Sequence, residues 1–136
     1  MPTQSAKPFK VVGTRTVIRV AIAIAILAAA GLWAIELAKR ARDARALSHE
    51  VTKQAILSLA SELEGITRTN ELPKDEAELE AILQRRLPLD GWGHAVHYQH
   101  ICTNRFKVWA ISATLEALVF EYDSADISRQ IKTYFF

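Results

Sequence analysis

The feature that most limits how this chain can fold is an uncharged apolar run of sixteen residues, Val20 to Ile35. A helix that crosses a bilayer core needs roughly 20 apolar residues, within a range of about 17 to 25. Apolar neighbours on both sides extend the run to that length if Arg19 snorkels toward the headgroups. The run therefore predicts a transmembrane helix over residues 20–38. Its lipid-facing anchor side chains are expected to be Val20, Ile22, Ile24, Ile26, Leu27, Leu32, Trp33 and Ile35.

Charge is distributed unevenly along the chain. Residues 1–19 carry four basic side chains and no acidic one, whereas the chain from Glu36 onward carries 13 basic and 15 acidic side chains. A nucleic-acid-binding domain would show a basic face on its folded part, so this balance argues against a nucleic-acid partner. A basic tail before an apolar helix favours a cytoplasmic segment at 1–19 and a single-pass inner-membrane protein with its C-terminal domain in the periplasm. Four basic residues also follow the helix (Lys39, Arg40, Arg42 and Arg45), so charge asymmetry alone does not fix the orientation.

Two other interpretations of the apolar run stay open. Arg15 and Arg19 can act as the n-region of a signal peptide, with residues 20–27 as its h-region and Ala28-Ala29-Ala30 as its cleavage site. The chain would then be an exported soluble binding module released by signal peptidase after Ala30. A third possibility is the core helix of a soluble protein. Retention in the membrane is favoured because apolar character continues past Ala30 to Ile35.

Residues 39–69 contain no proline and only one glycine, Gly65. Apolar residues recur there at spacings of three and four, the pattern of one apolar stripe on a helix. We therefore expect the membrane helix to continue as an amphipathic helix that packs on a sheet of the same chain or in a coiled-coil dimer. The stripe comprises Leu37, Ala41, Ala44, Leu47, Val51, Ala55, Leu59, Leu63 and Ile66.

Residues 70–136 are expected to form an α+β head. Asp75 with Glu78 three residues later is typical of a helix N-cap pair, and the following helix is predicted to run to about Arg86, where Pro88 ends it.

After that helix the apolar period changes from helical spacing to two. Residues 96–101, 106–111 and 117–123 alternate as strands do, with a turn at 103–104, and "IKTYFF" at the end is a candidate fourth strand. The fold class expected is thus a long N-terminal helix, membrane-embedded in its first half, packed on a small antiparallel sheet of three to four strands. Cys102, the only cysteine, is expected to be a small buried residue in a strand.

The stretch "LPLDGWGHAVHYQ", residues 87–99, has the residue types of a tight corner between helix and sheet. Gly91 and Gly93 allow backbone angles that other residues resist, and Asp90 can bond nearby backbone N–H groups. Trp92 is expected to fill the space between helix and sheet. These residues are predicted to shape the head rather than to perform chemistry.

With its place in the chain, this stretch resembles the C-terminal half of the major pseudopilins of type II secretion, the G-type pseudopilins. That family shows a leucine-rich short helix, a proline, an Asp-x-Trp-Gly element and a tyrosine in the next strand. The matching signature here is Pro88, Asp90, Gly91, Trp92, Gly93 and Tyr98. The resemblance implies a pseudopilin-like fold and a structural, non-enzymatic role in protein secretion. The implied partners are other pseudopilin-like subunits or membrane proteins of the secretion platform, besides membrane lipid.

The chain departs from the family at two places. Prepilin peptidase normally cuts after a glycine that is followed by Phe and, at the fifth mature residue, Glu. Gly13 is followed here by "TRTVIR", so this processing motif is absent. The family's calcium loop is rich in glycine and acidic side chains; this chain has Asp123 and Asp126 there but no glycine after Gly93. No cofactor is expected, and a calcium site at these two aspartates is a minor alternative.

The spacing of three histidines raises the hypothesis that they bind a metal ion. His94, His97 and His100 form an H-x-x-H-x-x-H series, but on a strand the middle one faces away from the other two. A three-histidine zinc site therefore conflicts with the predicted strand, and a His-dependent metalloenzyme is the least favoured function. The chain shows no nucleophile elbow, phosphate loop or Cys–His pair at catalytic spacing, so we do not expect an enzyme.

Overall fold

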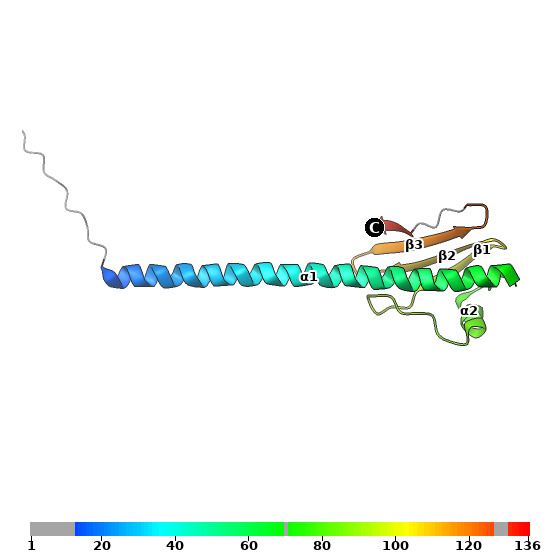
Figure 1. The fold of residues 1–136 in the computed structure, drawn as a ribbon, viewed down its shortest axis with the longest axis horizontal. Coiled ribbons are helices and arrows are strands. Elements are labelled where there is room, and N and C mark those ends of the chain that lie inside the picture. The colour runs from blue at the N-terminus through cyan, green and yellow to red at the C-terminus, as the bar shows by residue number, and fades with distance from the viewer. Residues whose placement is uncertain (1–12, 70, 127–130) are drawn as a thin grey trace, which may run out of the picture. The chain divides into compact units, whose positions relative to one another are not determined.

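The computed structural model describes residues 13–69, 71–126 and 131–136. They form two helices and four strands in the order α1 (Thr14–Thr69), α2 (Glu76–Leu83), β1 (His97–Cys102), β2 (Arg105–Ile111), β3 (Glu116–Asp123) and β4 (Ile131–Phe135) (Figure 1). The chain divides into two compact units, Met1–Arg42 and Asp43–Phe136. Most of the predicted basic tail, residues 1–12, lies outside the described residues.

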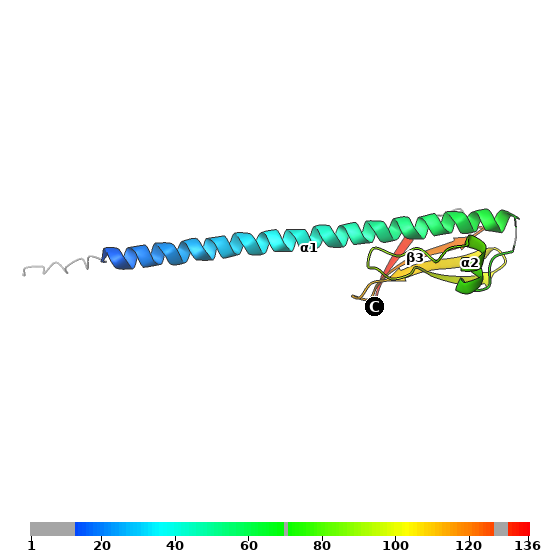
Figure 2. The same ribbon diagram turned by 90° about the horizontal axis from the view of Figure 1, so that it is seen from below.

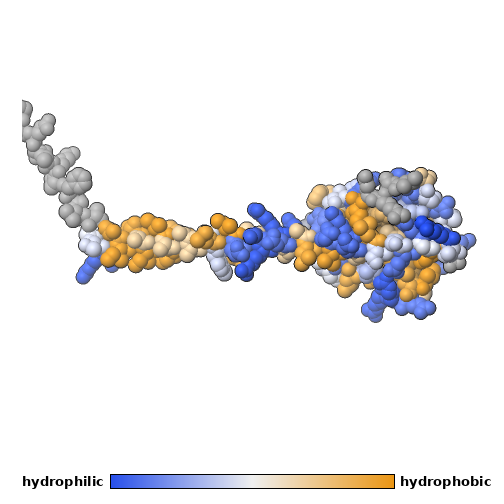
Figure 3. Space-filling view, viewed as in Figure 1, coloured by the Kyte–Doolittle hydropathy of each residue, from blue (hydrophilic) through white to orange (hydrophobic). Residues whose placement is uncertain are grey.

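The described part of the first unit is helical from Thr14 onward. An 18-residue window of α1 has a mean hydropathy of 2.3, and none of that window is buried. All eight expected anchor side chains are exposed, and the segment is orange in Figure 3. The predicted apolar helix is confirmed, and it is long and apolar enough to cross a membrane.

The second unit contains an antiparallel sheet in the order β1-β2-β3-β4. Its central register pairs Val108 with Phe120, and its last hairpin pairs Leu118 with Thr133. The expected α+β fold class is confirmed, and β4 supplies the fourth strand. Cys102, expected to be buried, is exposed at the end of β1, where the pairing with β2 becomes irregular.

The C-terminal part of α1 lies along one face of this sheet (Figure 2). Apolar side chains from both elements form one core cluster with exposed fractions of 4% or less (Ile56, Leu59, Ala60, Leu63, Tyr98, Phe106, Val108, Ala110, Leu118 and Phe120). Phe106 is central to its aromatic part, because its ring lies 6.3 Å from that of Phe120 and 4.9 Å from that of Tyr122. Four of these ten core side chains therefore come from the same helix that begins as the apolar segment.

The buried face of α1 differs from the predicted stripe at its start. Leu59 and Leu63 are buried as expected, but Leu47 and Val51 are exposed, and Thr52 is fully buried in their place. Thr52 can be buried because its hydroxyl is satisfied twice, as donor to the Ser48 carbonyl and as acceptor from a loop N–H. Apolar periodicity could not predict a threonine at this position.

Helix α2 begins as predicted and ends earlier than predicted. The Asp75 side chain accepts a hydrogen bond from the Glu78 backbone N–H at 2.8 Å, which is the expected N-cap. The helix ends at Leu83, not near Arg86, because Gln84 adopts a left-handed conformation (φ 53°) and its N–H bonds back to the Ala81 carbonyl. Pro88 lies four residues beyond this cap and therefore does not end the helix.

We predict that Leu59→Ala lowers the free energy of unfolding of the second unit by about 2–5 kcal/mol, because it opens a cavity in the core. Leu47→Ala, on the same helix but 66% exposed, is the matched control and should change it by less than about 1 kcal/mol. Urea denaturation of the full chain in detergent, followed by tryptophan fluorescence, measures both. Equal effects of the two substitutions would contradict the described core.

Candidate functional site at the corner of the second unit

The corner predicted from the sequence is built around the Asp90 side chain. Asp90 is buried, and its Oδ1 atom accepts hydrogen bonds from the backbone N–H groups of Trp92 at 2.8 Å and His94 at 2.9 Å. The Asp90 N–H donates in turn to the His94 carbonyl at 2.7 Å. One carboxylate thus closes the loop on itself, as expected for an aspartate in a turn.

Gly91 is needed for a different reason from the one predicted. Only Gly93 has a left-handed backbone (φ 87°) among the described glycines. A Cβ atom on Gly91 would lie 2.0 Å from the carbonyl oxygen of Ser48, so the loop backbone touches the backbone of α1 directly. The Gly91 N–H donates to the Thr52 hydroxyl at 2.9 Å, which fixes this contact. The glycine is required by close approach.

The other signature residues surround this contact. Tyr98 is buried, and its hydroxyl donates to the Pro73 carbonyl at 2.7 Å. Trp92 is only partly buried and packs against the edge of the core, so it does not fill the space between helix and sheet. Pro88 is also partly buried, and its carbonyl accepts a hydrogen bond from the Val96 N–H at 3.0 Å.

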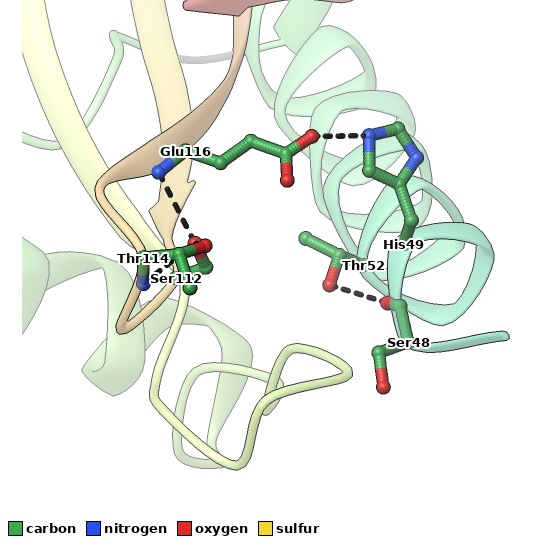
Figure 4. Close-up of polar contacts among 6 residues, drawn as sticks. All are labelled: Ser48, His49, Thr52, Ser112, Thr114 and Glu116. Atoms are coloured by element: carbon green, nitrogen blue, oxygen red, sulfur yellow. Dashed lines mark hydrogen bonds and ion pairs between the residues drawn. The ribbon is translucent and has the colours of Figure 1, made fainter. Parts of the chain in front are cut away.

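A cleft of about 240 Å³ opens beside the corner. Its walls come from α1, the corner and the turn between β2 and β3: Ala44, Arg45, Ser48, Trp92, Ser112, Ala113, Thr114 and Glu116. Next to the cleft, the Nε2 atom of His49 lies 3.1 Å from Oε1 of Glu116, which lines it, and both side chains are largely buried (Figure 4). These two residues are 67 positions apart, and neither belongs to a local motif, so only the fold reveals the pair.

The polar groups at this cleft hold the turn together. The Ser112 hydroxyl accepts hydrogen bonds from the N–H groups of Thr114 at 3.3 Å and Glu116 at 3.1 Å. In Figure 4 the contact drawn for His49 is Glu116, whereas Ser112 and Thr114 lie together in the turn, their hydroxyl oxygens 2.9 Å apart. A serine nucleophile needs a histidine within hydrogen-bond reach, and no such pair occurs at this cleft.

The three predicted histidines do not converge. His97 stacks on Trp109 and approaches Glu76 at 3.1 Å through Nδ1, whereas His94 is exposed in the loop before β1. Within residues 13–69, 71–126 and 131–136, no three His, Cys, Asp or Glu side chains are placed to share a metal ion.

The two aspartates of the minor calcium alternative lie at the end of β3 (Asp123) and three residues beyond it (Asp126). Asp123 pairs with the Arg105 guanidinium at 3.2 Å, and Arg105 also binds Glu121 at 3.0 Å. A guanidinium thus already neutralises the carboxylate that calcium would need. Asp126 lines a pocket together with Asp123 and Arg105, and it is the last described residue before position 127.

Comparisons with protein-family models, with curated proteins and with solved structures gave no match to this chain. The architecture, a long apolar N-terminal helix followed by a small antiparallel sheet, is compatible with that of pseudopilins. The resemblance to that family rests on the residues of the corner and on this order of elements.

We predict that Gly91→Ala destabilises the second unit by about 1–3 kcal/mol, because the added methyl group must push the loop away from α1. The control is Gly65→Ala, at an exposed position of α1 where an added Cβ meets nothing within 4 Å. This control should stabilise the helix by up to about 1 kcal/mol. Thermal or urea unfolding measures the change in the free energy of unfolding for both variants. Changes of the same sign would contradict the contact between Gly91 and α1.

A second prediction concerns Tyr98. Burial raises the pKa of its hydroxyl from 10.0 to about 12, and the nearby Glu78 carboxylate adds to the rise. The unfolded chain therefore releases this proton near pH 10, while the folded chain keeps it until about pH 12. Its contribution to stability is complete below pH 10 and is lost as the pH rises toward 12.

Tyr98→Phe removes this titration and the hydrogen bond to Pro73. The free-energy difference between wild type and this variant, about 1 kcal/mol at neutral pH, should shrink between pH 10 and pH 12. Denaturant melts at a series of pH values measure it, and the remaining tyrosines and lysines cancel because both proteins contain them. A constant difference across this range would contradict the pKa assignment.

Proposed function

We propose that this chain is a single-pass inner-membrane structural subunit, similar to a pseudopilin, with its second unit in the periplasm. The main observation behind the proposal is that the two parts of α1 have different roles. Its first part exposes an apolar surface on every side, and its last part completes the core of a separately packed α+β unit. A soluble protein gains nothing from an exposed helix of this hydropathy, whereas a bilayer covers it.

An exposed apolar row on α1 within the second unit supports assembly with other subunits. Ala44, Leu47 and Val51 follow one another at spacings of three and four and are exposed, because the sheet packs on the neighbouring face of the helix. A row of this kind can pack against a similar helix. The proposed mechanism is therefore lateral packing with like subunits or with membrane proteins of a secretion platform.

The resemblance to G-type pseudopilins adds the expectation of a role in type II secretion. In support, Asp90 and Tyr98 are buried and bonded, and Gly91 makes the closest contact of loop and helix. The absent processing motif after Gly13 means that the proposed subunit keeps its basic tail and is not trimmed by prepilin peptidase.

A second candidate function is an exported soluble binding module released after Ala30. One observation favours it: every buried residue of α1 lies at or beyond Thr52, so cleavage after Ala30 leaves the core of the second unit intact. The cleft beside Trp92 would then be its binding surface.

Cell fractionation and N-terminal sequencing separate these two candidates. The chain is expressed in a host with inner and outer membranes, and the mature N-terminus is read from each fraction. The anchored subunit should resist carbonate extraction, fractionate with the inner membrane and keep residues before Gly31. Its second unit should be digested by protease only after the outer membrane is opened. A mature chain that begins at Gly31 in the soluble fraction would contradict the anchored subunit and support the released module.

Disulfide cross-linking tests the assembly surface. With Cys102→Ser as background, Leu47→Cys places a thiol on the exposed row, and Ala46→Cys places one on an exposed position that helical geometry turns about 100° away from Leu47. In membranes, we expect an oxidised dimer from Leu47→Cys and little from Ala46→Cys. Equal cross-linking at both positions would show that this row is not a contact between subunits.

A further inference from the structure

The sheet of the second unit has two edge strands, β1 and β4, and the chain covers only the edge at β1. There, the Val96 N–H donates to the Pro88 carbonyl at 3.0 Å, and the Tyr98 N–H donates to the Glu76 carboxylate at 3.1 Å. On the outer side of β4, by contrast, no described residue makes a backbone hydrogen bond to the strand. An uncovered edge of this kind is a template for a further strand.

The hydrogen bonds around β4 show which of its backbone groups face outward. The Phe136 N–H donates to the Leu115 carbonyl at 3.1 Å, so residue 136 bonds toward the β3 side. The β3 strand agrees, because the Glu116 carbonyl bonds toward β2 and its neighbour Ala117 therefore bonds toward its partner Tyr134. Successive residues of a strand bond to opposite sides. The residues of β4 whose N–H and C=O groups face away from the sheet are Ile131, Thr133 and Phe135.

These outward groups are arranged symmetrically about Thr133. A second copy of β4, antiparallel to the first and centred on this residue, places Thr133 opposite Thr133 of the second copy and Ile131 opposite Phe135 of the second copy. Every outward N–H then meets an outward C=O, as in a regular antiparallel ladder. A shift of one residue would set outward groups against inward ones, so the strand is complementary to itself in this register.

The side chains of β4 also suit this register. Lys132 is the only charged residue of the strand, and it lies opposite Tyr134 of the second copy rather than opposite its own equivalent. The two ammonium groups therefore do not face each other, and each lies beside an aromatic ring. On the face toward the core, the partly buried Ile131 lies opposite Phe135, which is 78% exposed in the single chain.

The strand lacks the features by which proteins usually block an edge. β4 contains no proline, and its pairing with β3 is regular over residues 131–135. Proline, bulges and several charges are the common protections of an edge strand, and Lys132 is the one such feature here.

We propose that two copies of this chain pair through the outer edges of β4, antiparallel and centred on Thr133, so that their sheets become one continuous sheet. This inference rests on the proposed assembly of like subunits and names a contact for it. The contact differs from the exposed row on α1, so one subunit can meet one neighbour through α1 and another through β4. Two such contacts on different surfaces link subunits into a row longer than a pair.

Disulfide cross-linking of the full chain in membranes tests both the contact and its register. In the Cys102→Ser background, separate variants carry Thr133→Cys, Lys132→Cys and Tyr134→Cys. Directly opposite residues of an antiparallel pair have Cα atoms about 4.5 to 5.5 Å apart, within the range of a disulfide, whereas the two copies of residue 132 or of residue 134 are offset along the strands. We expect a dimer from Thr133→Cys alone. Lys132→Cys and Tyr134→Cys should give little dimer alone and a mixed dimer when they are expressed together.

A proline substitution provides the matched control. Thr133→Pro removes an outward N–H and leaves the bonds to β3 in place, so it should abolish the mixed dimer with little change in the urea midpoint of unfolding. Lys132→Pro removes a bond to β3 and should lower that midpoint. The reverse order of the two midpoints would show that the outward groups are assigned wrongly and would overturn the proposal.

The cross-linking pattern separates this proposal from the proposed function. Equal dimer from all three single variants, no dimer from Thr133→Cys and the mixed pair, or a mixed dimer that persists with Thr133→Pro would each overturn the pairing of β4. If the Leu47→Cys dimer still forms in that case, the subunits assemble through α1 alone. Loss of that dimer as well would contradict the assembly of like subunits.

Discussion

The contact on which the second unit depends is the approach of the Gly91 backbone to the backbone of α1 at Ser48. No side chain separates the two segments there, and the buried Thr52 hydroxyl joins them by accepting the Gly91 N–H and donating to the Ser48 carbonyl. This contact sets the rotation of the helix over the sheet. Leu59 and Leu63 consequently face Phe106 and Phe120, while Leu47 and Val51 remain on the outside.

Much of the fold could be predicted because its signals are local. The uncharged run at 20–35, the Asp75 cap and the period-two strands each depend on neighbouring residues, and all three are present. The strands alternate as predicted, and Phe106, Val108 and Phe120 belong to the buried core with the side chains of α1. The early end of α2 was not predictable from Pro88, because a left-handed Gln84 gives no compositional signal.

The site was less predictable because its contacts join distant segments. Asp90 bonds within its own loop, and the sequence indicated that role. The reason for Gly91 lies 43 residues away at Ser48, and the His49–Glu116 pair joins a helix to a turn, so neither has a local signal. Trp92 was expected in the core because of its size. The contact of the preceding residue, Gly91, with α1 leaves Trp92 at the rim of the cleft instead.

Because α1 supplies four of the buried core side chains of the second unit, it also determines how that unit responds to force. A pull along the axis of the part of α1 that belongs to the second unit reaches the sheet as sliding between Ile56, Leu59 and Leu63 and the strands beneath them. Sliding strains all of these contacts together, whereas peeling would break them one at a time. A force applied to α1 therefore acts on the whole second unit before that unit unfolds.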